Sequence, residues 1–375
     1  MSPHLRGIRH AHKSRKGGEK GKLKTGFRVK PGMTLIERST MTEIVAKVYR
    51  GKREESVHYG SVAVVDKQGQ LTHYVGDPEF FTFVRSSCKP FQLIPLIETG
   101  AADKYGFTPK QLAIMCGSHI GTDHHREVVM KNLDAAGNKP EHLKCGTHVP
   151  IYMTMAGSFP QNHENEDPVR HNCSGKHSGF LALARFLGED VAEYLNPNSR
   201  TQQMVLEAVA EMFGYPKEKI LISIDGCSAP NFGLPTIYTG IAFMKLANAV
   251  GQTPRRVETL KRIKAAMTEF PVMFSGEGRF DLALMRTFPG NVVCKVGAEA
   301  IQGIGLSDPA IGIVVKIHDG NQRALYPVCL EVLKQLGIKG VDESEHLRTF
   351  INPEIRNNMN IFTGHIRAEF RLKKV

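Results

Sequence analysis

The sequence predicts an α+β fold, in which an antiparallel sheet of N- and C-terminal strands carries helices on its faces. Three observations predict it. Strand-like runs lie near both ends of the 375-residue chain, the region between them has helical periodicity with marked start and stop signals, and no internal repeat or linker interrupts the pattern. With 41% hydrophobic residues, a chain of this length can bury a large core.

The sheet is expected to begin with a meander of three runs: Glu43–Tyr49, Ser61–Asp66 and Leu71–Val75. A turn-rich segment, residues 67–70, separates the last two runs. Further strands are expected after the helical middle at Lys219–Ile224, Asn291–Lys295, Ile311–Ile317 and Gly364–Leu372, with a helix at Arg323–Leu336. The two ends of the chain would then close one sheet.

Helix signals are clearest in the middle of the chain. Thr108 and Pro109, followed by Gln111, supply an N-cap, a proline at the first helical position and the partner of a capping box. The other expected start and stop signals are Asn198 or Ser199 with Gly214, Thr253-Pro254 with Pro271, and the closing glycines Gly100, Gly137 and Gly188.

The net charge of +12 is concentrated at the N-terminus. Residues 1–40 contain eleven Lys or Arg against two Glu, a net charge of +9, which leaves +3 for the other 335 residues. We predict that residues 1–40 are a disordered basic leader and that residues 41–375 form a single catalytic domain with a helical middle. Two interpretations of the leader stay open: translation that starts at Met41, and an arm that binds nucleic acid or another surface.

The cysteine content and the apolar runs indicate the compartment. No run reaches the roughly 18 apolar residues of a membrane helix, and the N-terminus lacks the apolar segment of a secretory signal. The seven cysteines are odd in number and scattered, so reduced thiols are expected rather than a disulfide framework. A soluble, cytoplasmic protein is predicted.

The first motif with possible chemistry is Ser86 and Lys89, three residues apart at the start of a helix expected to run towards Thr99. This spacing places both side chains on one helical face, within reach of each other. A serine becomes a nucleophile when a base accepts its proton, and a lysine is such a base where burial or a nearby cation lowers its pKa. An ordinary helix start is the alternative interpretation.

A second motif is the glycine-punctuated loop from Cys116 to His125, which contains Ser118. Its backbone N–H groups suit an oxyanion or carboxylate pocket. A site with three histidines as zinc ligands is disfavoured, because the adjacent His124 and His125 point to different sides of a helix.

Two further segments carry reactive side chains. Cys173 and Cys227 lie in polar, glycine-rich loops, and soft thiolates bind zinc well, although ordinary reduced cysteines would give the same pattern. Lys295 ends a predicted strand beside Gly297, where a solvated turn is the alternative to a functional lysine.

Taken together, the motifs resemble those of the rhizobial-type, or class 3, L-asparaginases of the asparaginase II family. The resemblance runs from about Ile44 to Leu372. It rests on these segments: Arg50-Gly51, residues 55–60, Arg85–Gln92, Ser118-His119, Asn172–Gly179, Asp225–Cys227, Gly276–Asp281, Lys295–Glu299 and Lys316–Ala324. The chain departs from the family in its basic leader, in Cys88 and in Gly117, and none of these is a matched functional residue.

The resemblance implies a fold like that of the serine β-lactamases and penicillin-binding proteins, with two Ser-Lys pairs in the site. The implied catalytic residues are Ser86 with Lys89, and Ser118 with Lys295. The implied zinc ligands are Cys173, Lys176 and Cys227, and the metal would have to compete with a proton for the amine of the lysine. Residues near the charged groups of the substrate would be Arg85, His177 and Asp225.

The predicted activity is hydrolysis of L-asparagine to L-aspartate and ammonia through an acyl-enzyme, with zinc as cofactor but not as the source of the nucleophile. A glutaminase or another serine acyl-enzyme hydrolase of the same fold is the nearest alternative. A β-lactamase is disfavoured, because no S-D-N or K-T-G element follows the Ser-Lys motif. A nucleic-acid-binding protein that acts through the leader is the alternative from another class, and a homodimer is the expected assembly.

Overall fold

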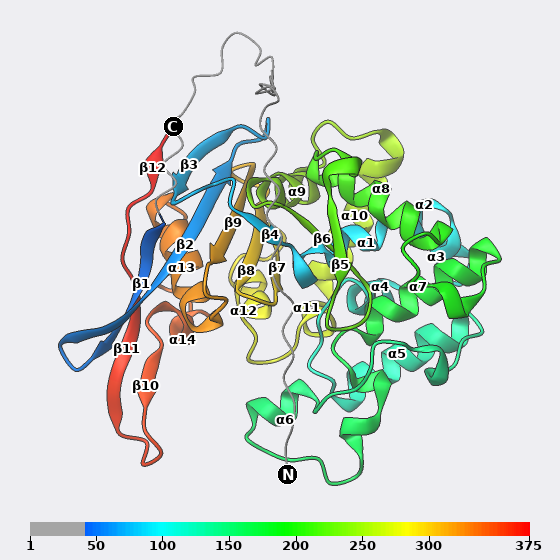
Figure 1. Ribbon diagram of the computed structural model, residues 1–375, viewed down its shortest axis with the longest axis horizontal. Coiled ribbons are helices and arrows are strands. Elements are labelled where there is room, and N and C mark those ends of the chain that lie inside the picture. Colours follow the sequence, from blue (N-terminus) through cyan, green and yellow to red (C-terminus); the bar gives the residue numbers. More distant parts are fainter. Residues whose placement is uncertain (1–41) are drawn as a thin grey trace, which may run out of the picture. The chain divides into compact units, whose positions relative to one another are not determined.

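The described part of the chain, residues 42–375 of a computed structural model, begins and ends in the same sheet (Figure 1). The predicted leader, residues 1–40, lies outside the described residues. The strands run in the order β10-β11-β1-β2-β9-β8-β7, with β3 paired to both β2 and β12, and every pairing is antiparallel. The strands are β1 (Glu43–Arg50), β2 (Arg53–Val65), β3 (Leu71–Val75), β7 (Val292–Gly297), β8 (Ile301–Leu306), β9 (Ile311–Ile317), β10 (Glu354–Arg356), β11 (Phe362–Ala368) and β12 (Lys373–Lys374). The predicted α+β class is confirmed.

The helices fill the middle of the sequence, and α9 and α13 pack directly on the sheet. The long helices are α4 (Pro109–Met115), α5 (Asp123–Ala135), α7 (Ser174–Leu187), α8 (Arg200–Phe213), α9 (Ile237–Asn248), α10 (Pro254–Glu269), α12 (Phe280–Thr287) and α13 (Gln322–Gln335). The short ones are α1 (Lys89–Gln92), α2 (Ile94–Glu98), α3 (Ala101–Lys104), α6 (Ile151–Met155), α11 (Pro271–Phe274) and α14 (Arg348–Ile351). A second sheet has the order β4-β6-β5 and consists of β4 (Phe81–Phe83), β6 (Pro230–Pro235) and β5 (Leu221–Ile224).

The capping signals are confirmed where the sequence was most explicit. Thr108 and Gln111 form a capping box at the start of α4, and Ser199 caps α8 through the backbone N–H of Gln202. Gly214 ends α8 in the left-handed conformation, with a φ of 69°, as a helix-terminating glycine does. These helices therefore begin and end for reasons that are visible in the local sequence.

Other expectations were wrong in extent. The strand expected from Ser61 begins at Arg53, and the helix expected from Ser86 towards Thr99 is broken into a 3-10 turn, Arg85–Cys88, and two short helices. Five strands, β4, β6, β8, β10 and β12, were not predicted. Of these, β6 and β8 contain glycine, and β6 also begins and ends with proline.

Helix α9 explains why β8 and β9 contain glycines. A Cβ atom on Gly303 would lie 2.1 Å from the ring of Phe243, and one on Gly312 would lie 1.9 Å from the backbone oxygen of Gly240. Both distances are far inside van der Waals contact, so only glycine allows the helix to approach the sheet this closely. This close packing holds β8 and β9 in place, and β8 pairs with β7, the strand that carries Lys295.

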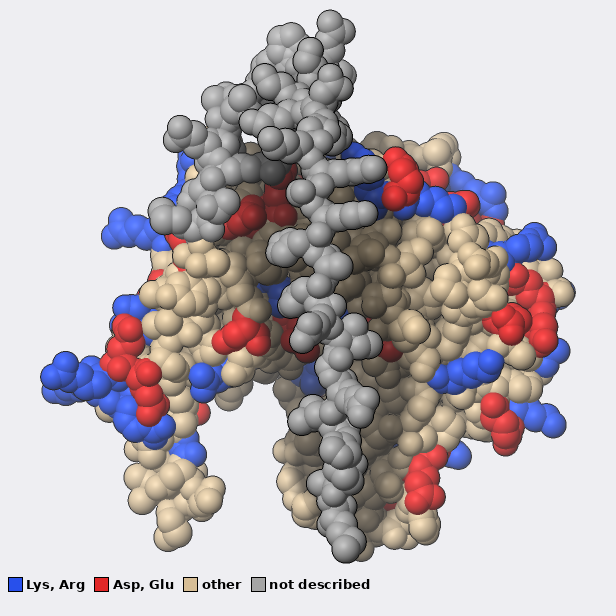
Figure 2. All heavy atoms as spheres, viewed as in Figure 1, with Lys and Arg blue, Asp and Glu red and all other residues tan. Residues whose placement is uncertain are grey.

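None of the helices in the described part of the chain has the length and apolar character that a membrane crossing needs. On the face shown in Figure 2, basic and acidic side chains are interspersed among uncharged ones.

Candidate active site

Ser86 lies in the 3-10 turn that follows β4, and this turn is anchored to β6. The backbone N–H of Val84 donates to the carbonyl oxygen of Phe232 at 2.9 Å, and that of Arg85 donates to the side chain of Asn231 at 3.2 Å. Arg85 has a φ of 49°, in the left-handed region that non-glycine residues rarely occupy. Ser86 is half-buried, and its hydroxyl has no hydrogen bond to any described residue. The hydroxyl is therefore uncommitted.

Lys89, which starts α1, is buried with 1% of its surface exposed. Its amine donates to the hydroxyl oxygen of Ser118 at 2.8 Å, to the carbonyl oxygen of Gly117 at 2.9 Å and to that of Asn172 at 3.4 Å. The sequence pairing of Ser118 with Lys295 is thus not the one observed, because Ser118 is bonded to Lys89. Two segments 29 residues apart meet at this hydrogen bond.

The loop that carries Ser118 joins α4 to α5 and is docked on α11. The backbone N–H of Ser118 donates to the carbonyl oxygen of Phe274 at 2.9 Å, and that of Gly117 donates to Ile114 at 3.2 Å. These two N–H groups are therefore occupied, and the predicted oxyanion or carboxylate pocket cannot use them. A Cβ atom at position 117 would lie 2.2 Å from the Phe274 oxygen, so the departure from the family at Gly117 is required by this contact.

Lys295 is buried in β7, not solvated in a turn, and 1% of its surface is exposed. Its amine donates to the backbone oxygen of Val296 at 2.8 Å and lies 3.5 Å from the carboxylate of Asp281. Burial lowers the pKa of Lys295 to about 8; Asp281 opposes this shift and the charge of Lys89 adds to it. We call Lys89, Ser118, Lys295 and Asp281 the lysine cluster.

The end of β7 packs against the turn that contains Ser86. A Cβ atom on Gly297 would lie 2.8 Å from the backbone oxygen of Val84 and 3.2 Å from the Cβ of Arg85. The strand and the turn therefore touch at a position where only glycine leaves room. This contact brings the Ser86 segment next to the strand of Lys295.

Arg85 and Asp225, predicted to face opposite charges of a substrate, form an ion pair with each other at 2.8 Å. Burial would raise the pKa of Asp225, but Lys176 and Arg85 together outweigh burial and lower it. Asp225 is thus a carboxylate that faces two cations, at the end of strand β5. The negative charge of Asp225 is complementary to an ammonium group.

Cys173, Lys176 and Cys227 also converge, and we call these three residues the thiol cluster. The amine of Lys176 donates to the sulfur of Cys227 at 3.0 Å, although 51 residues separate them. A hydrogen bond with Cys227 is the largest cause that lowers the pKa of Cys173 well below its usual value. Burial opposes a charge on Lys176, but Cys227, Cys173 and Asp225 outweigh it and raise the pKa of Lys176. All seven cysteines are free, as predicted, and all of them are buried.

His177 lies behind the thiol cluster and is fully buried. Its Nδ1 lies 2.7 Å from the hydroxyl of Tyr194, and its Nε2 is a buried polar atom without a hydrogen-bond partner. Burial lowers the pKa of His177 to about 4, so the ring is neutral at pH 7. His177, which was predicted to lie near the charged groups of the substrate, is therefore a neutral and buried side chain.

The predicted zinc ligands include soft donors that suit zinc, but they do not form a cluster of the usual ligand residue types. Within residues 42–375, no group of three or more His, Cys, Asp and Glu side chains is placed to hold a metal. The predicted set contains only two residues of those types, both cysteines, because its third member is the amine of Lys176. Two adjacent thiols with the unpartnered Nε2 of His177 nearby are soft and borderline donors of the kind that zinc prefers.

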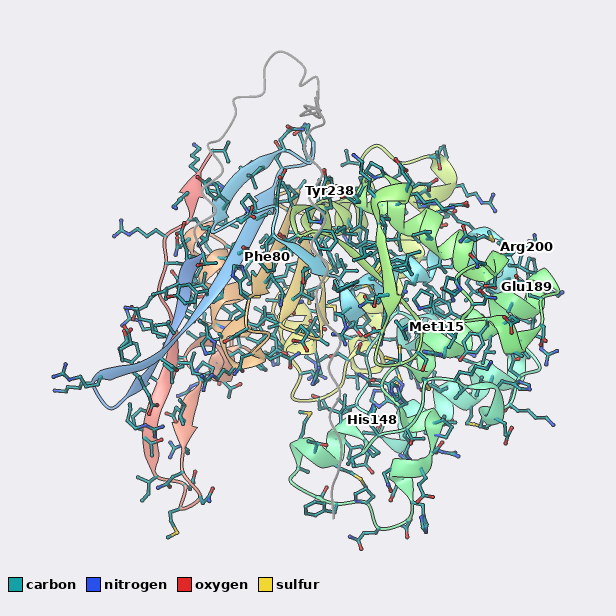
Figure 3. The ribbon with its side chains drawn as sticks, in the orientation of Figure 1. Phe80, Met115, His148, Glu189, Arg200 and Tyr238 are labelled. Carbon is teal, nitrogen blue, oxygen red and sulfur yellow. The ribbon has the colours of Figure 1, made fainter. Side chains whose placement is uncertain are left out.

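Several residues that position the site were not found by sequence reasoning. His148 accepts a hydrogen bond from the backbone N–H of Asn172 at 3.1 Å, and the carbonyl of Asn172 faces Lys89. Met115, at the end of α4, lies beside Lys176. Both His148 and Met115 come from the helical part of the molecule (Figure 3). Neither has a sequence signal, because each acts through a backbone group or through packing.

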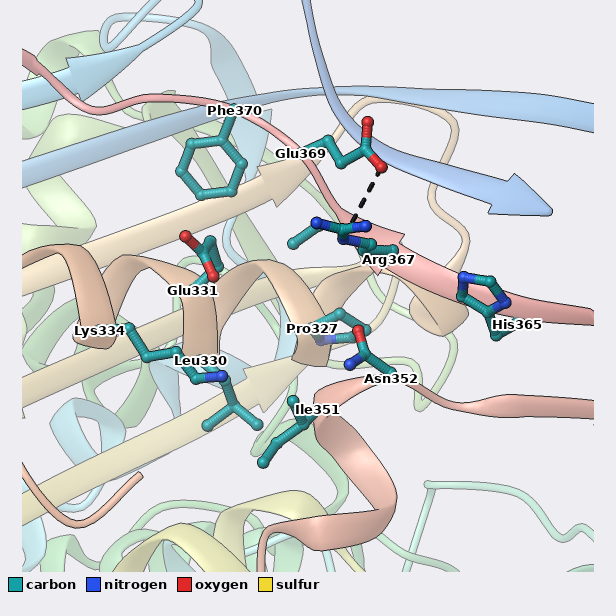
Figure 4. Close-up of a pocket in the computed structure, with 11 residues that line it drawn as sticks. Pro327, Leu330, Glu331, Lys334, Ile351, Asn352, His365, Arg367, Glu369 and Phe370 are labelled. Atoms are coloured by element: carbon teal, nitrogen blue, oxygen red, sulfur yellow. Dashed lines mark ion pairs between the residues drawn. The ribbon is translucent and has the colours of Figure 1, made fainter. Parts of the chain in front are cut away.

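A separate hollow of about 540 Å³ lies between α13, α14 and β11 (Figure 4). It is lined by charged residues that include Lys334 and Arg367, and by the apolar Leu330 and Ile351. None of the predicted site residues lines it. The lysine and thiol clusters lie elsewhere, around the Ser86 turn.

Comparison with known proteins gives a family and a set of structural neighbours. The family model described as L-asparaginase II matches residues 46–368. Among solved structures, Mglu in its native form is similar at 13% identity and a TM-score of 0.41, over 74% of this chain and 64% of that one. A β-lactamase from Mycobacterium bovis is similar at 13% identity and a TM-score of 0.38, over 74% and 94% of the two chains. A Bacillus glutaminase is similar at 14% identity and a TM-score of 0.36, over 74% and 91%. No match is found among curated proteins.

Proposed function

Because the chain belongs to the L-asparaginase II family, and is by that membership an amidohydrolase, we propose that it hydrolyses the side-chain amide of L-asparagine to L-aspartate and ammonia. One observation carries the proposal. The buried amine of Lys89 lies 2.8 Å from the hydroxyl of Ser118. Lys89 follows Ser86 by one turn, and the hydroxyl of Ser86 has no hydrogen-bond partner among the described residues. A serine that is open to substrate, next to a buried lysine and a second serine, is the arrangement that acyl transfer needs.

Ser86 is the proposed nucleophile, because Ser118 is buried and already bonded to Lys89 whereas the Ser86 hydroxyl is half-exposed and free. Its oxygen attacks the carboxamide carbon, and its proton passes to the Lys89 and Ser118 pair. The C–N bond then breaks, the nitrogen leaves as ammonia after it takes up a proton, and a β-aspartyl ester remains on Ser86. Water hydrolyses the ester and returns the proton to the serine.

Lys295 supplies the second basic group. An amine with a pKa of about 8 is present in both protonation states near pH 8, which is the condition for efficient proton exchange. Lys295 is also an electrostatic neighbour of Lys89, since the charge of each affects the other. We assign it the proton that moves to the leaving amide nitrogen.

The substrate is a zwitterion and needs one partner of each sign. Asp225 offers a carboxylate to the ammonium group, and Arg85 offers a guanidinium to the α-carboxylate. In the absence of substrate these two side chains neutralise each other across 2.8 Å. Binding then exchanges one internal ion pair for two ion pairs with the substrate, which favours a ligand that carries both charges.

Cys173, Cys227 and Lys176 are the residues that would hold zinc. When bound, zinc supplies a fixed positive charge next to Asp225. The metal must displace a proton from Lys176, so its affinity rises with pH. The thiol cluster therefore serves substrate binding, and the nucleophile comes from Ser86.

The experiment is a measurement of ammonia release by the full-length protein with L-asparagine and, separately, with L-glutamine. Ser86→Ala is expected to abolish turnover of both. Ser87→Ala is the matched control, because the hydroxyl of Ser87 is buried and donates to the backbone oxygen of Val84, away from Lys89. The control should keep its turnover and lose about 1 kcal/mol of stability.

Full turnover by purified Ser86→Ala protein would refute the nucleophile, and no ammonia from either amide would refute the activity. The two amides differ by one methylene, a difference that pockets resolve by about 10–200-fold. A glutaminase would reverse the preference.

A further inference from the structure

Asp281 is a buried carboxylate that the proposed mechanism does not use. It lies in the first turn of α12, with 1% of its surface exposed. A carboxylate this deep is costly unless charge and hydrogen bonds compensate it. The groups around Asp281 therefore indicate how its buried charge is compensated.

Three groups compensate Asp281. The backbone N–H of Val296 donates to Oδ2 at 3.1 Å, the side-chain amide of Gln302 donates to Oδ1 at 3.0 Å, and the amine of Lys295 lies 3.5 Å from Oδ2. Val296 and Lys295 are adjacent in β7, and Gln302 belongs to β8. The carboxylate is thus fixed to two neighbouring strands, at the paired positions Val296 and Gln302 next to the lysine.

We propose that Asp281 is a positioning residue, which holds the amine of Lys295 in place and keeps it able to carry a proton, while Gln302 fixes the carboxylate. This inference rests on the proposed function, in which Lys295 exchanges a proton. It goes beyond that function because it makes a residue outside the Ser-Lys pairs responsible for the pH range of the reaction.

Apart from Asp281, the charged groups around Lys295 disfavour its protonation. Lys89 and Arg279 both disfavour a proton on Lys295, and burial disfavours it most. The thiols of Cys294 and Cys116, which also face Lys295, have raised pKa values through burial and are neutral. Asp281 is the strongest influence that favours the proton, ahead of Cys294, so its removal leaves burial and two cations dominant.

The test is the pH profile of kcat/KM for asparagine. In the wild type, one limb should have an apparent pKa of about 8, contributed by Lys295. Asp281→Asn keeps the shape of the side chain and removes its charge, so that limb should move to lower pH by about one unit or more. Asp281→Glu restores the charge and should bring the limb back towards its wild-type position.

Glu277→Gln is the matched control. Glu277 lies four residues before Asp281, is solvent-exposed and pairs with Arg286, and it is absent from the charges that affect Lys295. Its removal should leave the profile unchanged. Thermal unfolding of all variants reports any loss of structure separately from the shift of the limb.

An active Asp281→Asn protein with an unchanged profile would overturn the inference while it leaves the proposed function intact. No amidase activity in the wild type would instead refute the proposed function. If neither Asp281 variant folds, the titration of Lys295 in the wild type decides, followed by NMR of labelled lysines and assigned with Lys295→Arg. A buried lysine without a charged partner titrates at about pH 5–6, and a value in that range would overturn the role of Asp281.

Discussion

The lysine cluster and the thiol cluster show the same residue type driven in opposite directions. Lys295 and Lys176 are buried almost equally, with 1% and 4% of their surfaces exposed. Burial lowers the pKa of Lys295 to about 8, and the nearby Lys89 adds to this shift. Burial also acts against a charge on Lys176, but Cys227, Cys173 and Asp225 raise its pKa. The depth of burial alone therefore does not determine the pKa of a buried lysine. The charges of its neighbours decide whether the pKa is lowered or raised.

The largest effect that tests this contrast is expected from Lys89→Met. The substitution removes the amine that bonds Ser118, and loss of a general acid-base group lowers turnover by about 10²–10⁴-fold. Lys176→Met removes an equally buried amine from the thiol cluster and should mainly raise KM. Ammonia release from asparagine measures both, and equal losses of kcat would erase the distinction between the clusters.

The next effect concerns stability and pH. The folded pKa of Lys295, about 8, lies below the unfolded value of 10.5, so the unfolded chain binds more protons between these values. The resulting destabilisation is complete below pH 8 and disappears as the pH rises to 10.5. It amounts to about 3 kcal/mol.

Denaturant unfolding from pH 7 to 10, in the presence of a chelator, measures this difference. The wild type should gain stability relative to Lys295→Met across the range. Relative to Lys176→Met it should show no such gain, because the pKa of Lys176 is shifted upwards. A flat difference for Lys295→Met would show that the fold does not lower the pKa of this amine.

The smallest effect is expected for the metal. Cys173→Ser should reduce the zinc content measured by atomic absorption and raise KM by about tenfold, with a smaller change in kcat. Cys329→Ser is the control, since Cys329 is a buried free thiol in α13, outside the cluster. Wild-type protein that contains no zinc after purification with added metal would contradict the zinc proposal.

The sequence predicts the parts of the fold whose causes are local. The capping box at Thr108 and the terminating Gly214 were legible because their partners lie within a few residues. Strand β8 was missed because Gly303 and Gly305 argue against a strand, and only the packing of Phe243 explains them. That packing joins residues about 60 positions apart, which no local pattern contains.

The candidate site divides in the same way. Spacing singled out Ser86 and Lys89, chemistry singled out Cys173 and Cys227, and the family resemblance supplied the roles predicted for them. The observed bond between Lys89 and Ser118 depends on where the 116–122 loop docks, so the sequence could propose the members but not the partners. Asp281 belongs to the Gly276–Asp281 segment that carries the family resemblance, but its role could not be predicted, because its partners Lys295 and Gln302 are distant in the sequence.

Gly117 sets a limit on how this protein can vary. Its carbonyl oxygen receives the Lys89 amine, and its Cα is pressed against the backbone of Phe274. Any side chain here would push the loop away from α11 and would move Ser118 from its neighbour by the same displacement. In this chain, with α11 packed as it is, a replacement of Gly117 should weaken the contact between Lys89 and Ser118, and new substrate preferences should arise instead through replacements around Arg85 and Asp225.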